Sequence, residues 1–185
     1  MHHAIVRWFV SLSAFCAALF ISSCELATNP LLFDGSPLSA NFTVIVTGNS
    51  FSGSNTIHLS DVFSGIDIDI DSVSVINVSI LIDSLSNGAV GSTTISGTGS
   101  VDGHALVTLD SVALSTFSSE RSIFDPTLSG AGVTYGSAGI SYINSMLRHP
   151  ESLPSSTSIS VSGTTSQNGR FKAHIKFYTQ VFTHP

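Results

Sequence analysis

Strict alternation of apolar and polar residues is the feature that most constrains how this chain folds. Residues 66–71 read Ile-Asp-Ile-Asp-Ile-Asp, and the same parity continues through Ile76, Val78, Ile80 and Ile82. A period of two places successive side chains on opposite faces of a β-strand. The segment therefore predicts either one long bent strand over residues 66–82 or two strands separated near residues 72–74.

The composition extends this prediction to the whole chain. Charged residues make up only 10% of the sequence, and 35 serines replace them as the polar partners in alternating segments. Disordered chains combine low hydrophobicity with high charge, whereas this chain is rich in Val, Ile and Leu. Because β-branched residues abound and the helix formers Glu and Lys are scarce, we expect a folded, all-β protein.

Turn residues punctuate the chain at intervals typical of an antiparallel sheet. Asp102-Gly103 predicts a hairpin, and Asn168-Gly169 predicts a type I′ turn that joins the last two strands into another. Further strands are expected at residues 42–47, 57–59, 92–101, 105–109, 158–162 and 171–181. This spacing predicts a β-sandwich over residues 41–185, with a β-barrel as the alternative.

Two segments depart from the strand pattern. Residues 116–137 contain several glycines and Asp125-Pro126, and are expected to form a long loop with short strands. Residues 138–147 carry the one helical pattern, with Ile140, Ile143 and Leu147 on one face. We expect a short helix that closes one end or edge of the sandwich and stops before Pro150.

The N-terminus shows a different pattern. Arg7 precedes an apolar run over residues 8–21, which small residues and then Cys24 follow. This is the layout of a secretory signal. The run of about 14 residues is shorter than the roughly 20 needed to span a bilayer.

Ile21-Ser22-Ser23-Cys24 resembles the lipobox of bacterial lipoprotein precursors. The resemblance implies that Cys24 receives a diacylglycerol, that the signal peptide 1–23 is cut off before it, and that the new N-terminus is acylated. In enterobacterial lipoproteins an Asp after the cysteine favours the inner membrane, so Glu25 favours the outer membrane. The alternatives are an ordinary signal peptide with an incidental cysteine and an uncleaved membrane anchor.

These features predict three parts: the signal peptide 1–23, a lipid-anchored tether over residues 24–40, and a β-sandwich over residues 41–185. Without residues 1–23 the chain has 12 acidic and 5 basic residues, a net charge of −7. An acidic chain argues against nucleic acid as a partner, because nucleic acids bind basic surfaces. Partners are therefore expected to be the membrane, through the lipid, and other envelope proteins.

Motifs for catalysis are missing from the sequence. It contains no Gly-x-Ser-x-Gly elbow and no His-Glu-x-x-His helix. The histidines beyond the signal lie without metal-ligand spacing at positions His58, His104, His149, His174 and His184. We therefore expect neither an enzyme nor a bound cofactor.

Asp67, Asp69 and Asp71 form a ladder of carboxylates on one strand face and are candidate ligands of a cation. The segment that begins at Asp67 does not match an EF-hand loop, because it lacks the glycine and the glutamate that such loops need. The alternatives are a solvated strand face and cross-strand pairing with Lys172 and Lys176 of the C-terminal strand.

Two functions follow from these predictions. The first is a lipid-anchored, non-catalytic protein with a structural or accessory role in contacting other components of the cell envelope. The alternative is a binding lipoprotein for a sugar or a hydrophobic ligand. Sugar sites favour exposed aromatic side chains, and after cleavage the candidates are Tyr135, Tyr142 and Tyr178.

Overall fold

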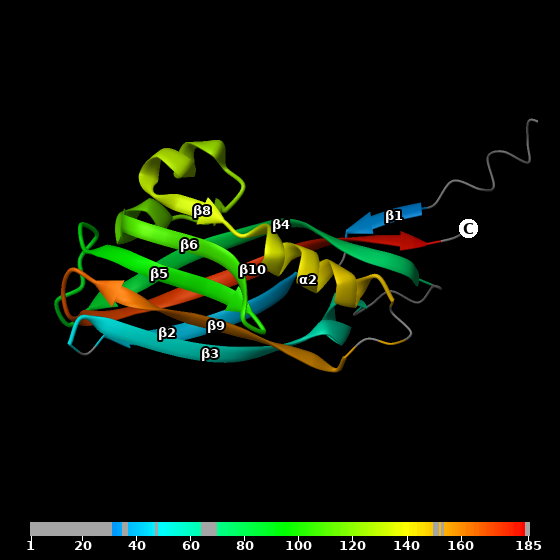
Figure 1. The fold of residues 1–185 in the computed structure, drawn as a ribbon, viewed down its shortest axis with the longest axis horizontal. Coiled ribbons are helices and arrows are strands. Elements are labelled where there is room, and N and C mark those ends of the chain that lie inside the picture. Colours follow the sequence, from blue (N-terminus) through cyan, green and yellow to red (C-terminus); the bar gives the residue numbers. More distant parts are fainter. Residues whose placement is uncertain are drawn as a thin grey trace, which may run out of the picture.

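The C-terminal strand β10 (Gly169–Thr183) is the centre of the first of two antiparallel sheets (Figure 1). The computed structural model describes residues 31–34, 37–46, 48–63, 70–149, 152 and 154–183. On one side β10 pairs with β4 (Ile70–Ser86), which also pairs with β7 (Arg121–Ser122). On its other side β10 pairs with β2 (Leu38–Val46) and, nearer its C-terminal end, with β1 (Leu31–Asp34).

The second sheet packs against the first. Its strands, in spatial order, are β3 (Ser50–His58), β9 (Ser156–Thr165), β5 (Thr94–Val101), β6 (His104–Ala113) and β8 (Val133–Tyr135). Within the described residues no strand pair links the two sheets. The fold is therefore the predicted all-β, antiparallel β-sandwich rather than a barrel.

Alternation places one face of each sheet in a shared core. In β2 and β10 nearly every second residue is buried, as the sequence pattern predicts. The largest fully buried side chains include Phe117, Phe171 and Phe177. Burial of apolar surface at about 25 cal/mol per Å² is the main stabilising contribution to such a core.

The predicted helix is confirmed as α2 (Ser137–Leu147), which contacts β6 of the second sheet and β4 of the first (Figure 1). Ile143 and Leu147 are fully buried, and Ile140 is half-buried against the core. The apolar stripe therefore covers one side of the sandwich between the two sheets. In the part of the chain that the structure describes, no helix has the length and apolarity to cross a membrane.

Residues 116–137 contain short elements, as predicted. The 3₁₀-helices η2 (Leu59–Phe63), η3 (Leu114–Phe117) and η4 (Pro126–Ala131) lie between strands. The last two alternate with β7 and β8. This stretch therefore joins an edge of the first sheet, at β7, to an edge of the second, at β8.

The predicted tether over residues 24–40 is wrong at its C-terminal end. β1 pairs with the end of β10, and Leu38 and Ala40 are buried in β2. Both strands therefore belong to the sheet and not to a flexible linker. The sheet therefore begins at Leu31, ten residues before the predicted boundary.

The continuous parity predicted for residues 66–82 is also wrong. Val73 and Val75 are buried at odd positions, Val78 and Ile80 at even positions, and Ile76 between them is 50% exposed. The pairing with β10 shifts register between Val75 and Asn77. Ile76 is thus the extra residue of a β-bulge, which reverses the faces that follow it. Residues 66–69 lie outside the described part of the chain.

The last two strands do not form the predicted hairpin. β9 pairs with β3 and β5 in the second sheet, whereas β10 belongs to the first. Neither Asn168 nor Gly169 has the positive φ of a type I′ turn. Their connection crosses between the sheets. By contrast, Asp102 (φ 45°) and Gly103 (φ 84°) form the predicted hairpin turn between β5 and β6.

Candidate functional site on the outer face of the first sheet

The outer face of the first sheet carries a network of polar side chains. Even-numbered residues of β10 point away from the core, and His174, Lys176 and Tyr178 follow one another along this face. Opposite them, β4 presents Ser79 next to Lys176 and Asn77 next to Tyr178. The alternation of β10 predicts this polar row, but the register with β4 decides its neighbours.

Glu120 completes the network from a distant part of the sequence. Its carboxylate accepts hydrogen bonds from Lys176 Nζ (2.7 Å), from Ser79 Oγ (2.6 Å) and from the Tyr178 hydroxyl. Glu120 reaches them because the neighbouring β7 pairs with Ser79 and Ile80 of β4. No local sequence pattern connects Glu120 to β10, so the sequence alone does not predict its role in this network.

The electrostatics of this cluster follow from its hydrogen bonds. The bonds from Lys176, Ser79 and Tyr178, in that order, lower the pKa of Glu120 to about 2. The same contacts with Glu120 raise the pKa values of Lys176 and Tyr178. All three groups therefore hold their usual charges firmly at neutral pH. General acid–base catalysis needs a pKa near the working pH, so this arrangement favours a structural role.

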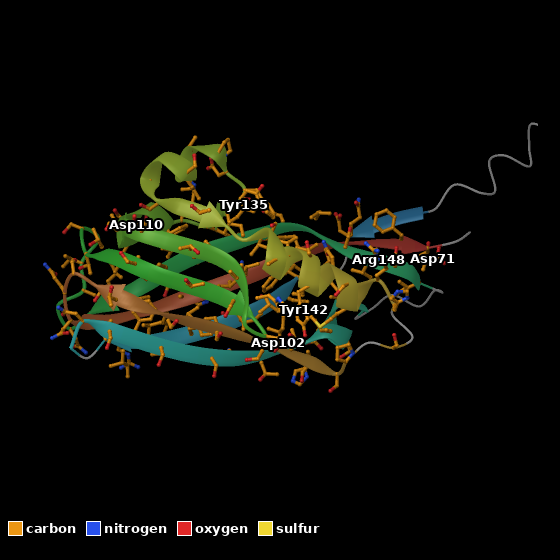
Figure 2. The ribbon with its side chains drawn as sticks, viewed as in Figure 1. Asp71, Asp102, Asp110, Tyr135, Tyr142 and Arg148 are labelled. Atoms are coloured by element: carbon orange, nitrogen blue, oxygen red, sulfur yellow. The ribbon has the colours of Figure 1, made fainter. Side chains whose placement is uncertain are left out.

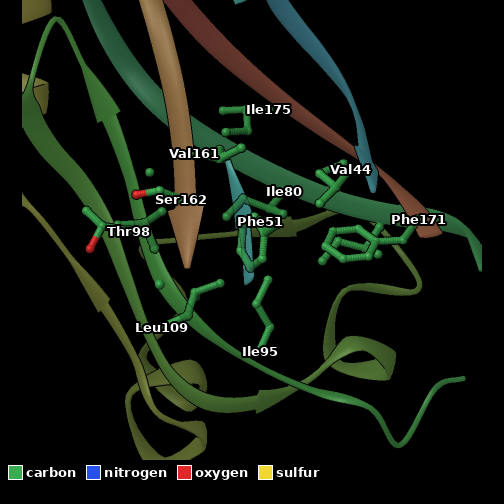
Figure 3. Close-up of a pocket in the computed structure, with 15 residues that line it drawn as sticks. Val44, Phe51, Ile80, Ile95, Thr98, Leu109, Val161, Ser162, Phe171 and Ile175 are labelled. Atoms are coloured by element: carbon green, nitrogen blue, oxygen red, sulfur yellow. The ribbon is translucent and has the colours of Figure 1, made fainter. Parts of the chain in front are cut away.

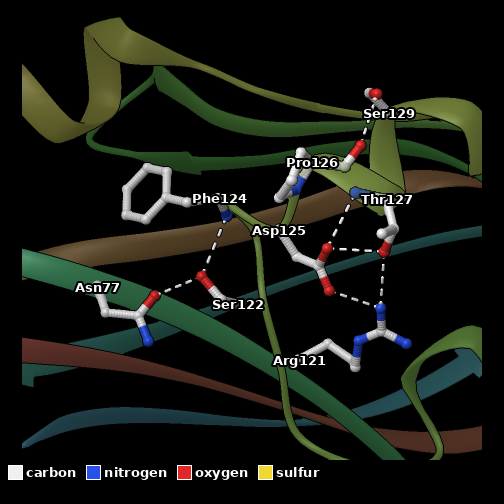
Figure 4. A network of polar contacts seen from close by, with 8 residues as sticks. All are labelled: Asn77, Arg121, Ser122, Phe124, Asp125, Pro126, Thr127 and Ser129. Carbon is white, nitrogen blue, oxygen red and sulfur yellow. Dashed lines mark hydrogen bonds and ion pairs between the residues drawn. The ribbon is translucent and has the colours of Figure 1, made fainter.

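A second network fixes the segment that carries Glu120 (Figure 4). Arg121 Nη2 lies 2.6 Å from Asp125 Oδ2 and donates to Thr127 Oγ1 at 3.1 Å. The Asp125 carboxylate also accepts from the backbone N–H of Thr127 and caps η4. Hydrogen bonds from Thr127 and Arg121 lower the pKa of Asp125 to about 2. Ser122 Oγ donates to Asn77 Oδ1 at 2.5 Å and so ties the segment to β4.

His174 is the one histidine held between polar groups of this face. Its Nδ1 lies 2.7 Å from Asn41 Oδ1, and its Nε2 lies 3.3 Å from Asp83 Oδ2. A hydrogen bond from Ser84, together with His174 and Lys172, lowers the pKa of Asp83. The Ser84 side chain bonds to Asp83 and not to His174, so within the described residues this pair lacks the nucleophile–histidine contact of a catalytic triad. Among the described residues no three His, Cys, Asp or Glu side chains form a group suited to a metal ion.

The three candidate tyrosines lie on three different elements, β8, α2 and β10. Tyr135 is 53% exposed and makes an edge-to-face contact with Phe124, with ring centroids 5.4 Å apart. Tyr142 stacks on His104 at 4.2 Å and donates to Asp102 of the β5–β6 turn. Tyr178 alone lines a recess, of about 400 Å³, together with the exposed Ile76.

The aspartate ladder is only partly described. Asp67 and Asp69 lie outside the described residues, as does Cys24. Asp71 is exposed near the start of β4, at the same end of the molecule as Arg148 (Figure 2). The C-terminal strand does lie in the same sheet, but Lys172 faces Asp83 at the other end of β4. The predicted pairing of Asp71 with Lys172 and Lys176 is therefore wrong, because the antiparallel register places Lys172 at the far end of β4 and Lys176 at its middle, opposite Ser79.

The interior of the sandwich holds a small apolar cavity (Figure 3). Its volume is about 50 Å³, and its walls include Phe51, Ile95, Leu109, Phe171 and Ile175. Ligand pockets generally measure about 300–1,000 Å³. The cavity as it stands is too small for a sugar ring or an acyl chain.

Comparison with known proteins leaves the function open. No family model and no curated protein matches the chain. Among solved structures, it is similar to the decameric BFDV capsid protein, with 10% identity over 82% of this chain and 99% of that one, and a TM-score of 0.34. A chain of the semi-empty VLP of the giant freshwater prawn Macrobrachium rosenbergii nodavirus gives 7% identity over 85% of this chain and 95% of that one, with a TM-score of 0.33. Likenesses this weak carry no conclusion about function.

Proposed function

We propose that this protein is a lipid-anchored, non-catalytic component of the bacterial cell envelope, where it contacts other envelope components in a structural or accessory role. The observation that carries the proposal is Ile21-Ser22-Ser23-Cys24 at the end of an apolar run. Each buried CH₂ of an acyl chain contributes about 0.8 kcal/mol, so two or three chains on Cys24 hold a protein firmly at a membrane.

The first strand of the described chain lies within a short reach of this anchor. Leu31, the first residue of β1, follows Cys24 by seven Cα–Cα steps, which span at most about 25 Å. β1 pairs with the last residues of β10. Anchoring at Cys24 therefore keeps that end of the sandwich close to the membrane, with the rest of the domain extending from it.

The outer-face network supports a non-catalytic role. Glu120 and Asp125 both have a pKa of about 2, because neighbouring donors stabilise their charged forms. Each carboxylate is therefore a weak base, and its donors are already engaged. Such side chains hold a surface in one shape, which suits a protein whose role is contact.

The anchor is tested with two matched cysteine substitutions. Cys24→Ala removes the residue that would be acylated, whereas Cys16→Ala changes the other cysteine within the apolar run. We expect intact-mass spectrometry to find acyl mass on a chain starting at Cys24 in the wild type and in Cys16→Ala. Cys24→Ala should accumulate as an unlipidated precursor. A mature N-terminus elsewhere, without acyl mass, contradicts the proposal.

The alternative of a binding lipoprotein is favoured by the recess beside Tyr178, whose volume is that of a small-ligand site. Its test is calorimetric titration of the full-length protein in detergent with a panel of neutral and amino sugars. Millimolar or tighter binding that is lost in Tyr178→Ala and kept in Tyr135→Ala supports the alternative. No binding across the panel counts against it.

A further inference from the structure

The second sheet is almost free of charged side chains. Its five strands contain a single Asp, Glu, Lys or Arg residue, which is Asp110 of β6. The strands of the first sheet contain seven: Asp34, Asp71, Asp83, Arg121, Arg170, Lys172 and Lys176. The few charges of the chain therefore gather on one sheet and leave the other nearly neutral.

Hydroxyl groups replace charges on the outer face of the second sheet. In β3, β9 and β5 the buried residues are odd-numbered, so the even-numbered residues point away from the core. Of the fourteen even-numbered positions in these strands, His58 is the one that is neither Ser nor Thr. This face therefore presents many hydrogen-bond donors and acceptors without formal charge.

The strand register aligns five of these hydroxyl side chains in one line across the sheet. The successive partners, from β3 through β9, β5 and β6 to β8, are Ser52, Ser162, Thr98, Thr108 and Thr134. Residues directly opposite each other on neighbouring antiparallel strands share a face. Because neighbouring strands lie about 4.8 Å apart, the line is about 19 Å long. We call these five residues the hydroxyl row.

The hydroxyls of this row are available to a ligand. Within the described residues none of the five forms a hydrogen bond with another protein group, whereas Ser100 and Ser160 of the neighbouring line bond to each other at 2.8 Å. Four of the five residues are exposed, and Thr98 is half-buried. In Figure 3 the hydroxyls of Thr98 and Ser162 point away from the apolar side chains of the interior cavity.

The chemistry of the hydroxyl row selects the class of ligand. A charged polymer finds no cluster of opposite charge on this face, and protein partners favour large aromatic or Arg anchors, which the outward positions of β3, β9 and β5 lack. A neutral glycan carries hydroxyls along its whole length, and each can donate to or accept from Ser and Thr. The distance of about 4.8 Å between strands is close to the length of one sugar residue in an extended chain. A glycan lying along the row thus places successive sugar residues over successive strands.

We propose that the hydroxyl row binds an extended, neutral, β-linked glycan chain of the cell envelope. This inference rests on the proposed function, because it names the chemistry of the envelope component that is contacted. Each hydrogen bond replaces one with water and contributes little by itself. Affinity therefore comes from several bonds along one chain and increases with chain length until the row is spanned. Since no ion pair takes part, binding does not depend on salt.

The test is calorimetric titration of the full-length protein in detergent with β-1,4-linked oligomers of N-acetylglucosamine, from the dimer to the hexamer. We expect affinity to rise at least about tenfold from the dimer to the pentamer, to level off at the hexamer, and to be equal in low and high salt. Tyr178→Ala should bind the pentamer as the wild type does, because Tyr178 lies on the other sheet.

Substitutions in the row separate the hydroxyls from the shape of the surface. Thr98→Val removes the central hydroxyl but keeps the branched side chain, and should weaken pentamer binding about two- to tenfold. Ser162→Ala tests the same row on the neighbouring strand and should have a similar effect. Thr98→Ser, which retains a hydroxyl, and Thr43→Val at an exposed position of β2 should leave the affinity within about twofold of the wild type. Melting curves verify that each variant is folded.

The proposal is overturned if no oligomer binds, if affinity does not rise with chain length, if high salt abolishes binding, or if both Thr98→Val and Ser162→Ala bind as the wild type does. Intact mass of the wild type and of Cys24→Ala reports on the anchor separately. A lipidated Cys24 without glycan binding refutes the hydroxyl row alone, and glycan binding by a wild-type chain without acyl mass refutes the anchor alone.

Discussion

Glu120 shows how much of this molecule depends on single side chains from distant segments. It lies 56 residues from Lys176 in the sequence and bonds to it at 2.7 Å. Ser79, which also donates to Glu120, is 2% exposed, so its hydroxyl has to find a partner within the protein. The buried serine and the exposed lysine meet at one carboxylate.

This cluster makes stability depend on pH. The pKa of Glu120 falls from the usual 4.5 to about 2 on folding. The stabilisation is therefore complete above pH 4.5 and is lost as the pH falls towards 2. Because the side chain is 32% exposed, we expect solvent screening to limit the loss to about 1 kcal/mol.

Glu120→Gln should lower stability at pH 7 by about this amount and flatten the decline between pH 4.5 and 2. Thermal melts across that range measure it. Part of the loss of stability between pH 4.5 and 2 should remain in this variant, because Asp125 also has a pKa of about 2. The exposed Asp110→Asn serves as the control for removing one negative charge. An acid profile of Glu120→Gln identical to that of the wild type contradicts the assignment.

Two glycines of the second sheet differ in the space around them. At Gly163 an added Cβ would lie 2.2 Å from the carbonyl oxygen of Ser96 and 2.7 Å from Gly97 Cα. At Gly53 it would meet Val161 at 3.6 Å and Phe42 at 3.7 Å, which are ordinary contacts. The strands β9 and β5 therefore need a residue without a side chain at position 163, whereas β3 has room for a methyl group at position 53.

We predict opposite effects for the two alanine substitutions. Gly163→Ala should destabilise the protein by about 1–3 kcal/mol or more, since backbone atoms have to move. Gly53→Ala should be neutral or stabilising by up to about 1 kcal/mol, because it reduces the freedom of the unfolded chain. Urea denaturation compares the pair directly. Equal midpoints for the two variants would show that the strands adjust to the methyl group.

At the scale of elements, α2 is the clearest agreement between pattern and packing. The spacing of Ile140, Ile143 and Leu147 predicts one apolar face, and the structure buries it between β6 and β4. The N–H of Val75 also donates to the Asn144 side chain at 2.7 Å, so the helix binds backbone of the first sheet. The helix thus protects part of the side of the sandwich that the strands leave open.

Leu147→Ala should cost about 2–5 kcal/mol, because the side chain is fully buried and its loss leaves a cavity. Ser141→Ala on the exposed face of the same helix is the matched control and should change stability by less than about 0.5 kcal/mol. Chemical denaturation measures both. An unchanged midpoint for Leu147→Ala would mean that the helix face contributes nothing to the core.

At the scale of the whole molecule, the first two strands of the described chain, β1 and β2, both lie beside the last one, β10. Asn41 of β2 and His174 of β10 are 133 residues apart in the sequence and in contact. The first sheet is not complete before β10 has paired with β4, and the second needs β9 between β3 and β5. The fold is therefore dominated by contacts between residues distant in the sequence. Such contacts slow folding, because the chain loses the entropy of closing long loops before the contacts can form.

We expect refolding on the order of milliseconds to seconds, and a single unfolding transition in which far-UV and near-UV circular dichroism coincide. Stopped-flow dilution from urea and equilibrium melts measure these two properties. Two separate transitions, or refolding in microseconds, would show that one sheet folds without the other.

The sequence by itself determined the local and periodic features of this protein. Alternation predicts strands, the spacing of Ile140, Ile143 and Leu147 predicts α2, and Asp102-Gly103 predicts a hairpin turn, because each depends on residues a few positions apart. The all-β class follows from the same patterns.

Only the tertiary structure decided which elements meet. The bulge at Ile76 reverses the faces of β4, β9 and β10 separate into different sheets, and Glu120 reaches Lys176 through β7. Strand order and register minimise free energy over the whole core, and a single segment carries little of that information. The partners of Lys172 and Lys176 were therefore beyond what their own strand could predict.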